Sequence, residues 1–391
     1  MSNKNYVRKS KEKKPVLAIC YDFDKTLSPD DMQAQGYIQS VGYDVKSFWE
    51  ESNSLAEHND MDGNLAYMYK MIEESEGNFV FNKQKLEEYG SKVELFPGVN
   101  YWFERIREYG KKHGVIVEHY IISSGLKEMI EGTSVAKKGA FEKIYASSFY
   151  FNDRGVAKWP AQVVNYTNKT QFLFRISKGV LDVNDPGVND YFLPSEIRVP
   201  FRNMIYIGDS DTDIPCMKLV NSYGGHSIGV YNPETNDKSK VYRMIKDHRI
   251  KFFEPADYSN GSGIDKLVKQ IIQKTAENEA LENIYYEREK EAFEYYKSQT
   301  DEEKEKNDLI DALDDSKDFK TTHSIIKELK KFSDWSDSQV EKLIKIALKN
   351  HPVRYIITDK DVKSFFKSII KNTDQCNDDL EKLKELITAV G

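Results

Sequence analysis

The sequence has few cysteines and no long apolar run, and each shortage excludes a class of protein. Its three cysteines, Cys20, Cys216 and Cys376, lie far apart in the chain and are odd in number. We therefore expect unpaired thiols in a reducing, cytoplasmic setting rather than a disulfide scaffold. The chain contains no apolar stretch long enough for a membrane-spanning helix. Its first residues are basic but lack the apolar segment of a signal peptide.

The chain also has fewer basic than acidic residues. The formal net charge is -7, with 57 basic and 64 acidic residues among 391. Nucleic-acid binding needs a concentrated basic face, so we expect no nucleic-acid partner. Residues 1–14 carry a short basic run, which is more typical of a flexible, solvated tail than of a binding arm. The basic residues of this run are Lys4, Arg8, Lys9, Lys11, Lys13 and Lys14.

What the sequence does contain points to several domains. A single hydrophobic core rarely grows beyond roughly 250–300 residues, so a chain of 391 residues should fold as two domains or more. Four short apolar runs, each followed by polar residues, have the character of buried strands, and helical patterns separate them. This alternation predicts an α/β fold with a doubly wound, parallel sheet over residues 15–274. The four runs are residues 16–21, 115–122, 204–207 and 227–231.

Two further segments interrupt or extend this alternation. Residues 29–98 contain helical patterns and end at a Phe-Pro-Gly turn signal, so we expect a helical insertion after the first strand. Residues 146–164 predict a hairpin with its turn near residues 152–155.

The character of the chain changes after residue 274. Residues 275–391 predict an additional all-helical domain without a catalytic constellation, in which Ser336 and Gln339 form one helix-capping box. At its start, a stripe of apolar and aromatic residues at helical spacing predicts a packed helix face. This stripe consists of Leu281, Ile284, Tyr285, Ala292, Tyr295 and Tyr296.

The residues that could take part in catalysis follow the predicted strands. Asp22 and Asp24 come directly after the first strand, two residues apart. At a turning strand end one carboxylate can attack phosphorus, forming an acyl-phosphate, while the other handles a proton. On its own this pair is only a moderate signal, because acidic pairs are common on surfaces.

Other segments strengthen the prediction of phosphate chemistry. Ser123 follows the second strand and offers a hydroxyl and nearby amides to phosphate oxygens, whereas Lys169 opens a helical pattern and can neutralise charge. Asp209 and Asp213 follow the third strand and can face one cation across a turn. Crowded carboxylates repel each other, and a divalent cation together with a lysine relieves that repulsion. Oxygen ligands favour Mg²⁺.

Taken in order, these residues resemble the four motifs of the haloacid dehalogenase (HAD) superfamily. The resemblance covers residues 14–274 and implies a Rossmann-like core in which the insertion at 29–98 is a helical C1 cap, as in phosphoserine-phosphatase-like members. The matching residues are Asp22 and Asp24 for the first motif, Ser123 for the second, Lys169 for the third, and Asp209 with Asp213 for the fourth.

The resemblance also implies the role of each residue. Asp22 would be the nucleophile and Asp24 the general acid and base of an Mg²⁺-dependent phosphatase, with Lys169 as the third catalytic residue. The expected metal ligands are Asp22, the backbone carbonyl of Asp24, and Asp209, supported by Asp213. The expected phosphate contacts are Thr26, Ser123, Ser124, Gly125 and Lys169.

Several alternatives stay open at this point. Lys178 is a rival for the third motif, whereas His119 and His226 are expected to be structural or surface residues. A phosphotransferase or mutase uses the same residues as a phosphatase. A regulatory binding protein, contacting a protein partner through residues 275–391, is a further alternative. The expected substrate is a small phosphorylated metabolite chosen by the cap, although the cap residues Gln33, Phe48, Tyr67, Tyr69 and Met71 fit a cap core better than a substrate site.

Overall fold

The computed structural model describes residues 6–371 and 378–388. The chain divides into two compact units, the first ending at Asn283 and the second beginning at Ile284. The boundary therefore lies within a helix, α11 (Gly263–Ser298), and not at the predicted position after residue 274.

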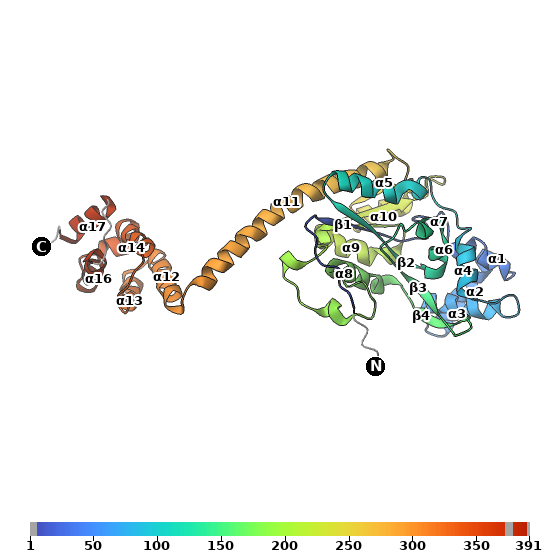
Figure 1. Cartoon of the computed structure of the whole chain (residues 1–391), viewed down its shortest axis with the longest axis horizontal. Helices are drawn as coiled ribbons and strands as arrows, with labels where there is room; N and C mark the ends of the chain where they lie inside the picture. The colour runs from blue at the N-terminus through green and yellow to red at the C-terminus, as the bar shows by residue number, and fades with distance from the viewer. Residues whose placement is uncertain (1–5, 372–377, 389–391) are drawn as a thin grey trace. The chain divides into compact units, whose positions relative to one another are not determined.

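A seven-stranded sheet forms the centre of the first unit (Figure 1). The strand order is β4-β3-β2-β1-β5-β6-β7, and all neighbours are parallel except β3 and β4, which form the expected antiparallel hairpin. The strands are β1 (Val16–Tyr21), β2 (Ile116–Leu126), β3 (Lys143–Phe151), β4 (Ala157–Gln162), β5 (Met204–Gly208), β6 (His226–Tyr231) and β7 (Phe252–Pro255).

Helices cover both faces of this sheet, which confirms the α/β prediction. Alternate side chains of β1 enter two different cores: Ile19 and Tyr21 pack into one, Ala18 and Cys20 into the other. Because both faces are buried, the strand is apolar throughout. The first core is shared by α5 (Val99–Lys112), α6 (Lys127–Gly132), α7 (Ser134–Lys137) and the beginning of α11, and the second by α8 (Thr170–Lys178), α9 (Ile214–Ser222) and α10 (Ser239–Lys246).

Four helices lie between β1 and α5 and are called the cap below. Figure 1 shows them in blue near the β3–β4 hairpin, and α3 contacts β4 while α4 contacts α6. Aromatic side chains such as Tyr37 and Phe48 pack edge to face inside the cap. The cap helices are α1 (Tyr37–Ser40), α2 (Val45–His58), α3 (Gly63–Ser75) and α4 (Lys83–Gly90).

The N-terminal segment departs from the expectation of a flexible tail. In its described part, residues 6–14, the Lys9 amide donates to the carbonyl of Gly179 at 2.9 Å, and the Lys9 ammonium pairs with Glu118 at 2.9 Å. Glu12 pairs with the buried guanidinium of Arg198. The basic run is attached because buried carboxylates of the first unit need partners.

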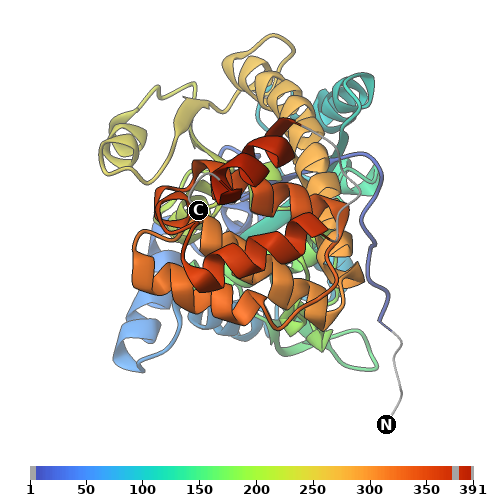
Figure 2. The same ribbon diagram turned by 90° about the vertical axis from the view of Figure 1, so that its left-hand side faces the viewer.

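The second unit is helical, as predicted, and Figure 2 shows its helices (orange to red) lying against one another. Its core contains residues such as Leu343, Phe365 and Leu383. Ser336 caps α14 in the expected box with Gln339. The helices are α12 (Asp301–Asp314), α13 (Phe319–Leu329), α14 (Asp337–Lys349), α15 (His351–Tyr355), α16 (Lys360–Lys371) and α17 (Asp378–Thr388).

One prediction for this region is wrong. The apolar stripe on α11 is not packed: all six of its side chains are exposed, including Leu281 at 68% and Tyr296 at 63%. The last side chain of α11 that is buried is Glu279, and most side chains of the helix beyond it are exposed.

The remaining sequence predictions concern membranes and thiols. In the described part of the chain, no helix is both long and apolar enough to cross a membrane. Cys20 and Cys216 are buried free thiols, and Cys376 lies outside the described residues.

Candidate active site

The site lies where β1, β2 and β5 end side by side. Asp22 directly follows β1, and its backbone amide donates to the carbonyl of Ile207 on β5 at 3.0 Å, which holds the start of the loop against the neighbouring strand. Only 5% of Asp22 is exposed. The carboxyl ends of parallel strands form the usual ligand-binding edge of such sheets, so this position suits a reactive carboxylate.

A buried lysine neutralises part of the charge at this edge. The Lys169 ammonium lies 2.8 Å from Asp213 and 3.4 Å from Asp22 and is fully buried. Burial alone would lower the pKa of Lys169, but the two carboxylates outweigh it and raise this pKa above its usual range. Lys169 precedes α8 directly, so the start of that helix faces the site.

Asp213 organises the loop after β5. Its Oδ2 accepts from the amide and hydroxyl of Ser210 at 3.0 and 2.9 Å, and its Oδ1 accepts from Lys169 and from the hydroxyl of Tyr206 at 2.8 and 2.9 Å. Four donors therefore occupy this carboxylate. Its contribution is to fix Lys169 and the loop that carries Asp209.

Asp22, Asp209 and Asp213 each place a carboxylate oxygen within 4.8 Å of the other two. Burial, with Asp213 next to it, raises the pKa of Asp22 to about 6 and that of Asp209 to about 7. These shifts show negative charge that Lys169 does not fully compensate. Oxygen donors at this spacing fit a divalent cation. Because Asp213 is already saturated with donors, Asp22 and Asp209 are the side chains best placed to be direct ligands.

Asp24 lies on the cap side of Asp22. Its Oδ1 accepts a hydrogen bond from the amide of Met32 at 2.9 Å, where the chain enters the cap. Burial, with Asp31 and Asp22 nearby, raises the pKa of Asp24 well above its usual value. Between the two aspartates and the cap, Lys25 adopts a left-handed conformation with a φ of 56°. This conformation turns the chain away from the strand direction directly after Asp24.

The irregular end of β2 after Ser123, where the strand register shifts, lies against the same aspartates. The Ser123 hydroxyl accepts from the amide of Gly125 at 3.1 Å, and its hydrogen bond to Asp22 offsets part of the rise that burial causes in the pKa of that carboxyl. A Cβ atom at Gly125 would lie only 2.7 Å from Asp24 Oδ2, so this close approach requires glycine. The hydroxyls of Ser124 and Thr26 are buried and have no hydrogen-bond partner among the described residues. A phosphate bound here would pair such groups.

The comparisons with known proteins agree with this geometry. The family model of haloacid dehalogenase-like hydrolases matches residues 19–218. This chain belongs to that family. An uncharacterized protein of Borreliella burgdorferi is 28% identical over 289 residues, covering 67% of this chain and 98% of its own length.

Solved HAD structures resemble the chain more distantly. A HAD family hydrolase from Salmonella enterica serovar Typhi is 18% identical with a TM-score of 0.44, over 67% of this chain and 73% of that one. A probable phosphoserine phosphatase from Vibrio cholerae is 11% identical with a TM-score of 0.42, covering 68% and 67%. Cytosolic 5′-nucleotidase IIIB bound to cytidine is 15% identical with a TM-score of 0.40, covering 68% and 87%.

Between the HAD core and the cap lies a cavity of about 420 Å³. Of the cap residues considered from the sequence, Tyr67 lines it, whereas Phe48 and Met71 are buried in the cap core. Gln33 is also buried and Tyr69 is exposed. Several other lining residues were not predicted from the sequence. In the helical insertion, amides and aromatic rings carry no motif, and the residues concerned there are Trp49, Asn53 and Asn64. The others are Lys25, Asp31, Gly63, Asn165, Tyr166, Ser210, Thr212 and Lys240.

The other residues considered for the site do not line the cavity. Lys178 donates to the carbonyls of Val188 and Asp190, both at 2.7 Å, and is not part of the cavity lining. His119 is buried between the hydroxyl of Tyr21 and the carbonyl of Phe103. His226 is also buried, and burial lowers its pKa to about 4. Both histidines are remote from the cavity lining.

Proposed function

We propose that this protein is a Mg²⁺-dependent phosphatase that cleaves phosphomonoesters through an aspartyl-phosphate on Asp22. The observation that carries the proposal is the buried group of Asp22, Lys169 and Asp213, with Asp209 close by, at the end of three parallel strands. An arrangement of this kind can hold one cation and one phosphate, and phosphoryl transfer needs mainly positioning and charge stabilisation.

Each residue has a role that follows from its surroundings. Asp22 attacks the phosphorus, because it is held at the strand end and is kept ionised by Lys169. Asp24, whose pKa is raised, donates a proton to the leaving oxygen and later accepts one from the attacking water. The hydroxyl of Ser124 and the amides around Gly125 bind phosphate oxygens. Bound Mg²⁺ would supply charge neutralisation at Asp22, Asp209 and the Asp24 carbonyl.

The size of the cavity supports a small phosphorylated metabolite as the substrate. About 420 Å³ lies in the range of small-molecule sites. The cap covers the nucleophile from one side, leaving little room for a folded protein. Rapid dephosphorylation of an intact phosphoprotein, with none of a metabolite panel turned over, would contradict this part of the proposal.

The test is phosphate release from p-nitrophenyl phosphate, with Mg²⁺ or EDTA, by wild type and Asp22→Asn. Asp211→Asn is the matched control, because Asp211 is an exposed aspartate of the neighbouring loop. We expect Mg²⁺-dependent turnover that EDTA and Asp22→Asn abolish and Asp211→Asn preserves. Adding an acceptor alcohol distinguishes a phosphotransferase, which would pass the phosphoryl group to the alcohol and release little phosphate. Folded, Mg²⁺-loaded wild type without either activity would contradict the proposal.

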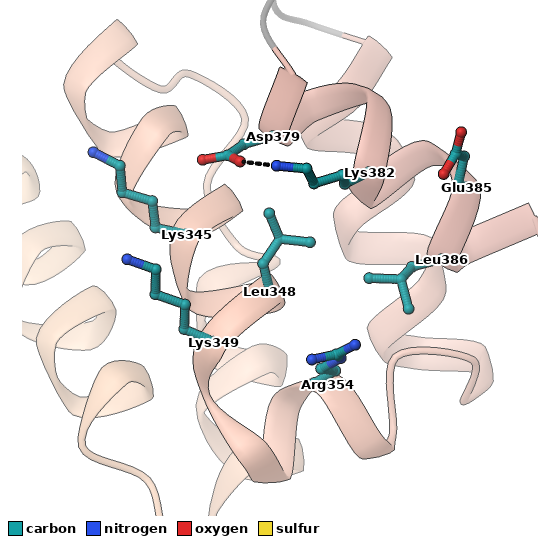
Figure 3. Close-up of a pocket in the computed structure, with 8 residues that line it drawn as sticks. All are labelled: Lys345, Leu348, Lys349, Arg354, Asp379, Lys382, Glu385 and Leu386. Carbon is teal, nitrogen blue, oxygen red and sulfur yellow. Dashed lines mark hydrogen bonds and ion pairs between the residues drawn. The ribbon is translucent and has the colours of Figure 1, made fainter.

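For the helical unit, we propose a protein partner that presents an acidic and partly apolar segment. A groove of about 540 Å³ lies between α14, α15 and α17, and Figure 3 shows the side chains that line it. Leu348 and Leu386 give it an apolar part, whereas Lys349 and Arg354 pair with no carboxylate within residues 6–371 and 378–388. The other lining residues are Lys345, Asp379, Lys382 and Glu385, of which Lys382 and Asp379 pair with each other at 3.1 Å.

Binding of a labelled helical peptide rich in glutamate and leucine to the full chain tests this surface. The double variant Lys349→Glu/Arg354→Glu should weaken binding at least about tenfold, since opposite charges become like charges. The control Lys320→Glu/Lys367→Glu makes the same change at exposed positions outside the groove. Equal losses in both variants, no binding by wild type, or binding to anionic vesicles in place of the peptide would overturn the proposal.

A further inference from the structure

The cap supplies a wall of uncharged side chains to the cavity. Trp49 and Asn53 lie one turn apart on α2 and therefore share a face, and α3 adds Asn64 and Tyr67. The Trp49 ring is held edge to face against Tyr67, with centroids 5.7 Å apart. The Tyr67 hydroxyl in turn donates to the carbonyl of Ser124 at 2.9 Å. The wall is thus connected to the end of β2 that is expected to hold phosphate.

Each lysine at the cavity already lies close to an aspartate. Lys25 pairs with Asp31 at 2.8 Å, and Lys240 lies 3.6 Å from Asp209. Lys169 is engaged by Asp22 and Asp213. Helices α2 and α3 place no charged residue in the lining. Nothing on the cap side is therefore available to neutralise a second anionic group of a substrate.

Two side chains of the wall offer hydrogen-bonding groups. The Trp49 Nε1 is buried and has no partner among the residues that the structure describes. The Asn53 amide is exposed and lines the cavity. A buried donor without an acceptor is costly, and a substrate hydroxyl or ring oxygen would relieve that cost. An aromatic ring beside amides is a common way to hold a polar, uncharged ring.

Building on the proposed phosphatase activity, we infer that the cavity selects phosphomonoesters whose alcohol is uncharged and rich in hydroxyl groups. Trp49 provides an apolar surface and an N–H donor. Asn53, one helical turn away, forms a hydrogen bond with a substrate hydroxyl. Sugar or polyol phosphates and nucleoside monophosphates share this chemistry. Substrates with a second anionic group, or with a carboxylate such as phosphoserine, lack a counter-charge in the cavity.

The test compares kcat/KM for a hexose phosphate, a polyol phosphate, a nucleoside 5′-monophosphate, phosphoserine, a sugar bisphosphate and phosphocholine, with p-nitrophenyl phosphate as reference. We expect the uncharged hydroxylated class to exceed the charged classes by about tenfold or more. Within that class, equal use of sugar phosphates and nucleotides indicates recognition of hydroxyls alone, and a preference for nucleotides indicates recognition of the base as well.

Trp49→Phe keeps an aromatic ring and removes the N–H. It should lower kcat/KM for the preferred substrate, relative to p-nitrophenyl phosphate, by about tenfold, and Asn53→Ala should act in the same direction. Glu50→Gln, on the solvent side of α2, is the control. A preference for phosphoserine, the bisphosphate or phosphocholine, or an unchanged ratio in both variants, overturns the inference while p-nitrophenyl phosphate turnover still supports a phosphatase. Loss of all turnover in wild type would instead contradict the proposed function.

Discussion

At the scale of single residues, the site depends on how one lysine is held. Lys169 is fixed by Asp213, which is itself fixed by Ser210 and Tyr206, so the ammonium has a defined position beside Asp22. In the proposed phosphatase, a side chain with this degree of burial and pairing would act on the charge of the bound phosphate without needing to reorganise. Lys178, at the other end of α8, donates to two backbone carbonyls and lies over the ring of Phe192.

This difference gives a matched pair of variants. Lys169→Met should lower kcat on p-nitrophenyl phosphate by about 10²–10³, because one preorganised charge is lost from the site. Lys178→Met should leave kcat within about threefold of wild type, since its ammonium donates to backbone carbonyls and not to the aspartates of the site. Steady-state kinetics with folded protein, verified by circular dichroism, measures both. Similar losses in the two variants would contradict the assignment of Lys169.

Single residues also explain why part of the site could be predicted from the sequence. Asp22, Asp24 and Asp209 could be placed because they follow apolar strands, and a parallel sheet gathers such positions at one edge. Trp49 could not be distinguished from Phe48, its neighbour, because both are aromatic residues of one helix. Phe48 points into the cap core and Trp49 lines the cavity, and that choice depends on how the cap packs.

At the scale of elements, the N-terminal segment and β2 are joined by a buried ionic network. The Arg198 guanidinium donates to both oxygens of Glu118 at 2.7 and 2.8 Å, and the hydroxyl of Tyr120 donates to the same carboxylate at 2.6 Å. These donors, Arg198 first among them, outweigh burial and lower the pKa of Glu118 to about 2. The buried charge of Glu118 is therefore stable in the folded protein only while these partners are present.

Removing one of these partners should therefore destabilise the folded protein. Arg198→Met is expected to lower the free energy of unfolding by about 3 kcal/mol, because it leaves the buried Glu118 carboxylate with only Lys9 and Tyr120 as partners. The double variant Arg198→Met/Glu118→Met should recover part of this loss, since the buried carboxylate is then removed as well. Urea denaturation measures both, with Arg154→Met in the exposed hairpin turn as the control. A loss below about 1 kcal/mol for Arg198→Met would show that water reaches Glu118.

Where α6 meets β3, a buried carboxylate has its pKa raised, in contrast to Glu118. Glu128 is buried and accepts one hydrogen bond, from the amide of Phe149 at 3.3 Å, and burial raises its pKa to about 7. The folded state thus holds the proton more tightly than the unfolded state, whose glutamate titrates near 4.5. Stability should fall as pH rises from about 4.5 to 7 and then level off, by about 3 kcal/mol for this group.

Glu128→Gln removes this titration. The difference in unfolding free energy between variant and wild type should therefore shift in favour of the variant between pH 4.5 and 7.5. Urea denaturation at a series of pH values and constant ionic strength measures the difference. A difference that does not change with pH would show that Glu128 ionises normally in the folded protein.

The sheet also shows which elements a sequence can specify. The prediction for β1 agrees with the structure, because a strand buried on both faces is a continuous apolar run bounded by charges. The strand β7 was missed: it has four residues, all partly exposed, at the edge of the sheet. So short a segment has no periodicity to detect, and its pairing with β6 is decided by the tertiary structure.

At the scale of the whole molecule, the two units are connected through one helix. The beginning of α11 is anchored in the first unit by Ile264, Val268 and Ile272. The sequence predicted a packed stripe farther along this helix, because helical spacing of apolar residues is the normal sign of a buried face. Spacing shows that one face is apolar, but a partner is needed to bury it, and none of the described residues does so.

An exposed helix of this kind is expected to open locally. Isolated helical segments are marginal in water, and residues 284–298 are almost all exposed and bury little apolar surface that could stabilise them. Limited trypsin digestion of the full chain should therefore cut first at Arg288, Lys290 or Lys297, which are exposed. Mass spectrometry should detect two resistant fragments, and the digest should retain turnover of p-nitrophenyl phosphate, because every proposed catalytic residue precedes the cut. First cuts before residue 284 or after residue 300, or complete protection of this stretch, would instead mean that the stripe is covered in solution.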